Sequence, residues 1–340
     1  PIFPMWDNYT SAMIGDHSSS IICDAAMKGF DLDLEKAYFY MHKNAFETPE
    51  NQEDYIDGKG RRSLTSYLQY GYIPIEDDVL YAFHKREHVS RTLEYAYDDW
   101  AVAQVAKKLG KTDDYNALMK RSQNYRNVFD ASKGWVCGRS VDGSFTSEFE
   151  ATKQMFYITE GTPKHYTFYV PHDVDGLIEL MGGKEKFNLE LNLLIDNKEY
   201  WHGNEPSHQI PYFFNYVDDW AKTQSTVKHI LESEYGTGPG GLAGNEDAGQ
   251  MSAWYVFSAM GFYPTCPGSN EYQLSSPVFD KVTLTLDTQY YPGGTFVLDT
   301  EPGNNYGTFN AVKLNESVIE PVITHEDIQK GGILKFSNTK

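Results

Sequence analysis

The feature that most constrains the fold of this chain is a succession of amphipathic helical segments joined by short links. The clearest segment begins at Ser90, which suits an N-cap, and continues with apolar residues on one face at helical spacing. Gly110 indicates its end, and the next helix runs from Thr112 to about Phe129. Because only a few residues link them, the two helices are expected to form an antiparallel hairpin.

Further amphipathic helices are predicted as far as about residue 260. They cover residues 33–47, 173–181, 183–195, 208–216, 218–234 and 248–260. Hairpin-paired helices in a chain of 340 residues predict an α/α toroid or a helical solenoid. The sequence has no repeated period, which argues against the solenoid.

The sequence changes character after Pro264. Residues 282–286 and 295–298 alternate apolar and polar side chains with period two, and paired glycines separate such runs. We therefore predict a mainly α fold with a helical catalytic domain over residues 1–264 and a small antiparallel β domain over residues 265–340. The second domain has no dense cluster of His, Asp or Glu, which favours a structural or accessory role.

Charge and composition narrow the class of partner. The formal net charge is −19, whereas nucleic acid and anionic lipid bind basic patches, so both are poor partners. No apolar run is long enough for a transmembrane helix, so no membrane span is expected. Aromatic residues make up 15% of the chain, which suits stacking on sugar rings, although such residues also fill cores. The three cysteines form no CxxC motif, so no zinc or redox site is indicated.

Three polar, loop-like segments carry candidate chemistry. Glu160 stands in a Gly- and Pro-containing segment before aromatic residues, where lost solvation would raise its pKa and suit a general acid. Asn204 and Glu205 offer hard oxygen ligands that suit Ca²⁺, with His202 and His208 beside them as candidates for sugar binding. The alternatives are a solvated loop Glu in the first segment and a helix-capping carboxylate in the second.

The third segment, residues 240–254, is rich in glycine, which lets a backbone approach a ligand closely. It contains Asn245 and Asp247 immediately before an apolar helix, and helix capping accounts for one of its acids but not for the whole cluster. Near the start of the chain, Trp6 is a candidate for stacking on a sugar, and Asp16 and His17 are candidates for bonding its hydroxyls. A capped helix start beside core aromatics is the alternative there.

Acidic loops on a helical scaffold fit glycoside hydrolysis by paired carboxylates. The sequence has no GxSxG, P-loop or GxGxxG motif, so nothing indicates an esterase, an NTPase or a dinucleotide-binding enzyme.

At these segments the chain resembles glycoside hydrolase family 92, the calcium-dependent exo-α-mannosidases. The resemblance covers nearly the whole chain and rests on long runs at residues 13–16, 92–100, 170–173, 203–208 and 249–255. It implies an (α/α)6 toroid, incomplete at its N-terminus, because the family places a β-sandwich and the first barrel helices before it. That β-sandwich is then the expected partner that completes the active site.

The resemblance also implies an inverting mechanism in which Ca²⁺ contacts the sugar. Glu160 resembles the general acid, and Asp247 resembles the general base, with Asn245 beside it where many relatives have Asp. Asn204, Glu205 and, less strongly, Gln250 resemble the calcium neighbourhood.

Two further departures from the family pattern concern the leaving-group site. Gly203 stands where α-1,2-cleaving members have an acidic residue, and Lys164 stands near a position usually taken by Trp. Both put the linkage that the protein cleaves in doubt.

We therefore predict an α-mannosidase that acts on mannose-containing glycans, with a role in N-glycan degradation and a secreted, periplasmic or cell-surface location. Two alternatives stay open. One is a metal-independent toroidal glycosidase that acts on another substrate. The other is a non-catalytic carbohydrate-binding or scaffold protein whose acidic loops only cap helices.

Overall fold

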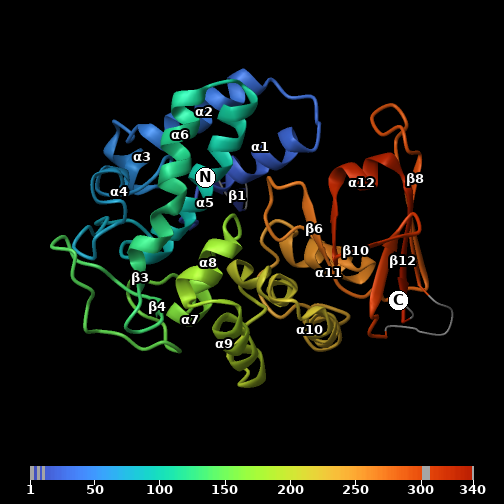
Figure 1. The fold of residues 1–340 in the computed structure, drawn as a ribbon. Helices are drawn as coiled ribbons and strands as arrows, with labels where there is room; N and C mark the ends of the chain where they lie inside the picture. Colours follow the sequence, from blue (N-terminus) through green and yellow to red (C-terminus); the bar gives the residue numbers. More distant parts are fainter. Residues whose placement is uncertain (1–3, 6–7, 10–11, 301–306, 339–340) are drawn as a thin grey trace. The chain divides into compact units, whose positions relative to one another are not determined.

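The computed structural model describes residues 4–5, 8–9, 12–300 and 307–338. They are divided between two compact units, Pro1–Met181 and Gly182–Lys340 (Figure 1). The predicted mainly helical composition with a smaller β part is confirmed. Trp6, predicted to stack on a sugar, lies outside the described residues.

The first unit is built around one long helix, α5 (His88–Lys108). Helices α1 (His17–Met27), α2 (Leu34–Phe46) and α6 (Thr112–Arg121) pack against it (Figure 1). The contact surface of α5 is made of small residues, which let the neighbouring helices approach closely: Ala101, Val102, Ala103, Val105 and Ala106.

Burial of α5 goes beyond the single apolar face that the sequence predicts. Seventeen of its 21 residues are buried, including Glu94, Asp98 and Asp99. A helix covered on nearly all sides is expected to be apolar all round, so buried carboxylates on it require charged or hydrogen-bonding partners. The helix therefore positions acidic groups as well as forming the core.

The remaining elements of the first unit are short. The predicted helix after Thr112 continues from α6 into a 3₁₀ helix, η1 (Ser122–Val128). The others are α3 (Gln52–Ile56), α4 (Leu64–Tyr70), α7 (Pro163–Thr167), α8 (Val174–Met181), β1 (Pro4–Met5), β2 (Asn8–Tyr9), β3 (Phe129–Asp130) and β4 (Trp135–Val136).

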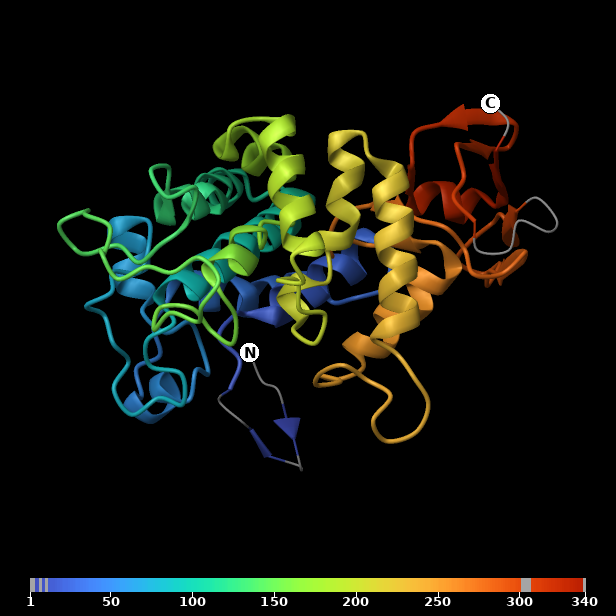
Figure 2. The same ribbon diagram turned by 90° about the horizontal axis from the view of Figure 1, so that it is seen from below.

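The second unit begins with helices and ends with sheets. Its helical elements are α9 (Lys184–Asp196), η2 (Glu205–Ser207), η3 (Ile210–Val217), α10 (Trp220–Ser233) and α11 (Gln250–Met260). The predicted helices at these places are confirmed, except that the segment predicted at 208–216 is a 3₁₀ helix. Figure 2 shows the loop between α10 and α11 projecting from the ends of the two helices.

The strands of this unit form two sheets. A five-stranded sheet has the order β10-β9-β12-β8-β7, in which only β12 and β8 are parallel, and a three-stranded antiparallel sheet has the order β11-β6-β5. The elements are β5 (Phe262–Tyr263), β6 (Glu271–Leu274), β7 (Lys281–Thr285), β8 (Thr295–Thr300), β9 (Ala311–Leu314), β10 (Ser317–Ile319), β11 (Val322–Thr324), α12 (His325–Lys330) and β12 (Gly332–Ser337).

Helices and sheets of the second unit share one core. Trp220 of α10 and Phe257 and Met260 of α11 pack against the buried side chains of the sheets. This packing joins α10 and α11 to the strands within one compact unit. The predicted domain boundary at residue 264 stays a prediction. Within the described part of the chain, no helix has the length and apolar character needed to cross a bilayer.

Candidate active site

The segment that carries Glu160 is fixed to the start of α5. The backbone N–H of Val89 donates to the carbonyl of Tyr157 (3.1 Å), and the N–H of Thr159 donates to the Ser90 hydroxyl (2.9 Å). Glu160 itself is exposed and has a left-handed backbone conformation (φ 46°). Such a conformation is uncommon outside glycine, and at Glu160 it directly follows the anchored residues.

An aromatic side chain connects this segment with a second carboxylate. Tyr166 is buried, which raises the pKa of its hydroxyl, and the negative charges of Glu94 and Glu160 raise that pKa further. A Cβ on Gly161 would lie 3.1 Å from the Tyr166 ring, so the backbone passes directly over the ring. The Glu160 side chain is nevertheless exposed, so the loss of solvation that the sequence predicted for it is not found.

Glu94 is a buried carboxylate that sequence reasoning did not single out. It accepts a hydrogen bond from the Tyr169 hydroxyl (2.9 Å), and its Oε2 lies 3.3 Å from Nε2 of His17. Burial lowers the pKa of His17, but the attraction of Glu94 outweighs it and the net pKa is raised. Glu94 and Asp98 stand four residues apart within a helical pattern, and this spacing of acids was the available signal.

Asp16, predicted to bond sugar hydroxyls, is buried at the start of α1. Its carboxylate accepts hydrogen bonds from the hydroxyls of Ser18 (2.8 Å) and Ser19 (2.9 Å) and lies 3.7 Å from Arg61. Its backbone N–H donates to Oδ2 of Asp98 (2.7 Å). Burial raises its pKa, but Arg61 and the hydroxyls lower it more. The first unit thus brings Asp16 and His17 together with Glu94 and Asp98.

Among the acids of this group, Asp98 has a strongly raised pKa. Burial and the nearby charges of Asp16 and Glu94 raise its pKa to about 8, while Arg61 and His17 oppose the shift. Its Oδ1 is buried and has no hydrogen-bond partner among the described residues. Asp98 is therefore largely protonated near neutral pH.

This shift predicts the pH dependence of stability. Because the pKa is raised on folding from 3.8, the stabilisation is present below about pH 4 and is lost as pH rises towards about 8. The loss is at most about 6 kcal/mol, at about 1.4 kcal/mol per pKa unit. Asp98→Asn, which keeps a neutral side chain, is expected to flatten this decline in urea denaturation, whereas Asp31→Asn at an exposed position leaves it unchanged. Equal slopes for Asp98→Asn and the parent protein would contradict the assignment.

In the second unit, two of the predicted segments meet through their glycines. A Cβ on Gly244 would lie 2.1 Å from the carbonyl oxygen of Gly203, and one on Gly203 would lie 2.7 Å from the carbonyl oxygen of Ala243. Real side chains never approach so closely, so only glycine allows this contact. It places the segment of Asn204 and Glu205 next to the loop of Asn245 and Asp247.

Two buried histidines hold these segments together. Nδ1 of His202 lies 2.7 Å from the Tyr200 hydroxyl, and its Nε2 lies 2.8 Å from the Tyr235 hydroxyl. Burial lowers the pKa of His202 to about 2, with the neighbouring His208 adding to the effect. Both ring nitrogens of His202 therefore bond to protein groups, which favours a positioning role over a direct sugar contact.

His208 orients the predicted calcium ligand Gln250. Nε2 of His208 lies 3.0 Å from the carbonyl of His202 and therefore donates to it, which leaves Nδ1 as an acceptor for the Gln250 amide (3.2 Å). Burial lowers the pKa of His208 to about 4, so the ring is neutral. The Gln250 amide also donates to the Tyr263 hydroxyl (3.1 Å), so its two N–H groups are used and its oxygen is the group left for a cation.

The donor set fits a hard cation in its chemistry. Asn204 is 6% exposed and precedes Glu205, the first residue of η2. Together with Gln250 they supply one carboxylate and two amide oxygens, which Ca²⁺ accepts. Among the residues that the structure describes, no group of three or more His, Cys, Asp or Glu side chains could hold a metal. A site here would therefore depend on amide oxygens.

Asp247 lies in a tight turn that precedes α11. Asp247 (φ 41°) and Ala248 (φ 58°) both have left-handed conformations, and Gly249 follows with φ 95°. The carbonyl of Glu246 accepts the N–H groups of Gly249 and Gln250, and its carboxylate accepts the N–H of Ser252 (3.2 Å). Gly249 is the N-cap of α11, and the side chain of Glu246, not that of Asp247, accepts a backbone N–H of the first turn, so helix capping does not account for Asp247.

The contact between the glycines predicts a local effect of substitution. Gly244→Ala is expected to separate the two segments and to destabilise the second unit by a few kcal/mol, because a methyl group cannot occupy that space. Gly240→Ala is the matched control, since a Cβ there meets no atom within 4 Å. Thermal unfolding of both variants tests this, and equal stability would show that the loops tolerate separation.

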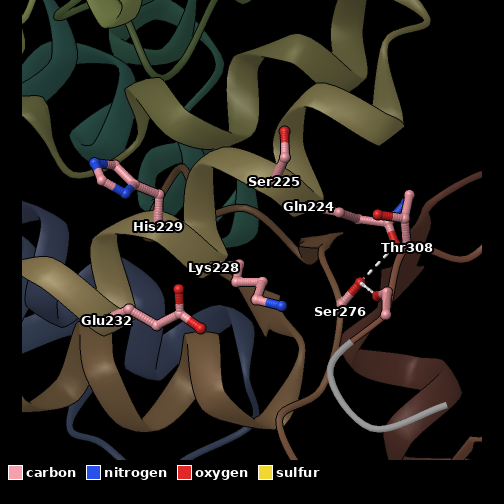
Figure 3. A pocket seen from close by; sticks show the side chains of 8 residues that line it. Gln224, Ser225, Lys228, His229, Glu232, Ser276 and Thr308 are labelled. Carbon is pink, nitrogen blue, oxygen red and sulfur yellow. Dashed lines mark hydrogen bonds between the residues drawn. The ribbon is translucent and has the colours of Figure 1, made fainter.

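A separate hollow of about 250 Å³ lies between α10 and the β part of the second unit. Figure 3 shows Gln224, Ser225, Lys228, His229 and Glu232 reaching it from one helix, with Ser276 and Thr308 opposite. The Ser276 hydroxyl, which has one proton to donate, lies within hydrogen-bond distance of Oε1 of Gln224 and of the carbonyl oxygen of Gly307. None of the predicted site residues that the structure describes lines this hollow.

Comparison with known proteins decides the family. The catalytic-domain profile of glycosyl hydrolase family 92 matches residues 1–340. The chain belongs to glycosyl hydrolase family 92. The resemblance inferred from the sequence is thereby confirmed.

Solved family 92 structures have the same fold. An α-mannosidase of this family from Bacteroides thetaiotaomicron is 34% identical with a TM-score of 0.87, over 100% of this chain and 44% of that one. An inverting mannosidase from the same organism is 33% identical with a TM-score of 0.85, over 97% and 46%. A secreted glycosidase of Arthroderma benhamiae, described as uncharacterized, is 29% identical over 79% of this chain and 38% of its own length. The family 92 chain thus spans less than half the length of these relatives.

Proposed function

We propose that the protein is an exo-acting α-mannosidase that hydrolyses terminal α-mannosides of glycans with inversion. The main observation in support is the similarity over nearly the whole chain to solved family 92 mannosidases, one of which is described as inverting. A related structure was solved in complex with mannoimidazole, which supports a mannose-shaped site in that protein. The proposal includes an (α/α)6 toroid and an N-terminal β-sandwich that completes the active site, since the relatives are more than twice as long.

In this proposal Glu160 is the general acid and Asp247 the general base. Glu160 gives its proton to the glycosidic oxygen, so that the leaving group departs as an alcohol and not as an alkoxide. Asp247 takes a proton from the water that attacks the opposite face of the sugar, with Asn245 bonding that water. The side chain of Glu246, rather than that of Asp247, bonds to the first turn of α11, which leaves the Asp247 carboxylate available and supports its role as the base.

We further propose that Asn204, Glu205 and Gln250 hold Ca²⁺. When bound, the ion supplies a positive charge that binds sugar hydroxyls and favours a distorted ring. The hydrogen bonds of Gln250 to His208 and Tyr263 support its part, because they direct its amide nitrogen towards the protein. We also propose that Asp16 and His17, which are bonded to Asp98 and Glu94, position the sugar. The name of the Arthroderma relative supports a secreted location and a role in glycan degradation outside the cell.

The test is release of mannose from α-mannosides by the full-length protein, with and without EGTA. Calcium-dependent release is expected, with β-mannose as the first anomer seen by proton NMR, because inversion turns an α-linkage into a β-product. Release that EGTA does not affect would favour a metal-independent glycosidase. Sugar binding without turnover by a folded protein would favour the carbohydrate-binding alternative.

A further inference from the structure

A polar pocket of about 420 Å³ lies in the first unit, apart from the proposed catalytic groups. This volume is within the range of small-ligand sites, roughly 300–1,000 Å³. Its lining combines an aromatic ring, a guanidinium, three carboxylates and an aliphatic side chain: Phe156, Arg86, Glu76, Asp78, Glu148 and Ile75. A ring face beside several hydrogen-bonding groups is complementary to a sugar, which has an apolar face and a rim of hydroxyls.

Part of the polar lining of this pocket is held in place before any ligand binds. Nε of Arg86 donates to Oδ2 of Asp78 (3.2 Å), and the guanidinium carbon lies 5.8 Å from the centre of the Phe156 ring. Oε2 of Glu76 accepts the backbone N–H of Val141 (3.1 Å). Glu76 and Asp78, which are held by these contacts, lose little conformational freedom on binding, which favours affinity for a small polar ligand.

The charge of the pocket selects against anions. Three carboxylates face one guanidinium, and the buried His88, 3.3 Å from Asp78, adds no charge because burial and the nearby Arg91 lower its pKa to about 4. The pocket is therefore net negative near neutral pH. A neutral sugar, whose hydroxyls donate to carboxylates, fits it, whereas a phosphorylated or sialylated sugar is repelled.

An exposed apolar turn rises beside the pocket. The ion pair of Asp78 and Arg86 closes its base, and the N–H of Val79 donates to the carbonyl of Lys85 (2.9 Å). The side chains on the turn are largely exposed, at 61% for Leu80, 89% for Tyr81 and 70% for Phe83. Tyr81 also has a left-handed backbone (φ 69°), a strained state that functional turns often keep.

The pocket is joined to the proposed general acid by a short, anchored segment. Phe156 precedes Glu160 by four residues, so their Cα atoms are at most about 14 Å apart, at about 3.5 Å per residue. The intervening Tyr157 and Thr159 are bonded to the start of α5. An oligosaccharide whose terminal residue lies at Glu160 can therefore reach the pocket.

We propose that this pocket is a leaving-group subsite that binds a neutral sugar residue of the glycan while its terminal residue is cleaved at Glu160. The Phe156 ring supports the sugar face, Glu76 and Glu148 accept from its hydroxyls, and the apolar turn contacts the next part of the glycan. The proposal rests on the proposed mannosidase function.

The test compares two substrates with the full-length protein: methyl α-mannoside, whose leaving group is too small for the pocket, and neutral α-linked mannotrioses. The double variant Glu76→Gln/Glu148→Gln is expected to raise KM for the trisaccharides by about tenfold, since it weakens two charge-assisted hydrogen bonds. Its kinetics on methyl α-mannoside are expected to stay unchanged. Glu150→Gln, an exposed neighbour outside the pocket lining, serves as the matched control on both substrates.

Equal effects of the double variant on both substrates, or no effect on either, would overturn the subsite. Tyr81→Ser provides a second readout, because it removes only an exposed ring and is expected to weaken trisaccharide binding alone. A parent protein that cleaves neither substrate would instead refute the mannosidase function. Trisaccharide binding to the folded parent and to the double variant, measured by calorimetry, then still tests the pocket.

Discussion

Replacement of Glu160 by Gln is expected to lower kcat for mannosides with poor leaving groups by a factor of about 10²–10⁴, the usual contribution of a general acid. The glycosidic oxygen of a natural glycan leaves only as a hydroxyl, so it needs a proton in the transition state. The amide keeps the shape of the side chain and removes that proton. Because Glu160 is exposed, the melting temperature is expected to change little.

The choice of leaving group in the substrate distinguishes a general-acid role of Glu160 from its other conceivable roles. An aryl mannoside with an acidic phenol needs little protonation, so the same variant is expected to lose much less activity on it. Glu150→Gln is the matched control, because Glu150 is also an exposed loop glutamate of the first unit, ten residues away. Equal losses on both substrates would assign Glu160 to sugar binding or structure, and full activity would remove it from the site.

Helix positions were predictable because they depend on local patterns. The spacing of apolar residues predicted α2, α8, α9, α10 and α11 to within about two residues. The same pattern failed to show that α5 is buried on nearly all sides, since Glu94, Asp98 and Asp99 are polar in sequence. Their burial is stabilised by groups distant in the chain, such as Arg61 and Arg121 on Asp99 (both within 2.6 Å), which no local pattern reveals.

The candidate site was predictable as a set of segments and less so in the roles of its residues. Glycine in the segment 240–254 indicated close approach of the backbone to a ligand, and in the structure Gly244 instead approaches the backbone of Gly203. That the two glycines meet each other depends on tertiary folding. The bonds of His202 to two tyrosines and the bond of Glu246 to the first turn of α11 likewise depend on side-chain directions that the sequence does not specify.

Asp247→Asn is expected to lower kcat by about 10²–10⁴, because an amide cannot take the proton of the attacking water. The substitution suits the backbone, since Asn tolerates the left-handed conformation that Asp247 adopts (φ 41°). The turn before α11 and the hydrogen bonds of Glu246 are therefore expected to persist, and loss of activity is not expected to come from unfolding. Circular dichroism and melting temperature check this point.

A small external nucleophile distinguishes a base from a structural residue. Azide needs no deprotonation, so it is expected to restore turnover to Asp247→Asn and to form β-mannosyl azide, the inverted product. Asn245→Asp then identifies the group that polarises the water: a carboxylate next to Asp247 raises activity if Asn245 bonds the water directly. Azide rescue of Asn245→Ala but not of Asp247→Asn would transfer the assignment to position 245. If both variants lose turnover and azide restores it to neither, the loop has a binding role, and this result would contradict base catalysis from it.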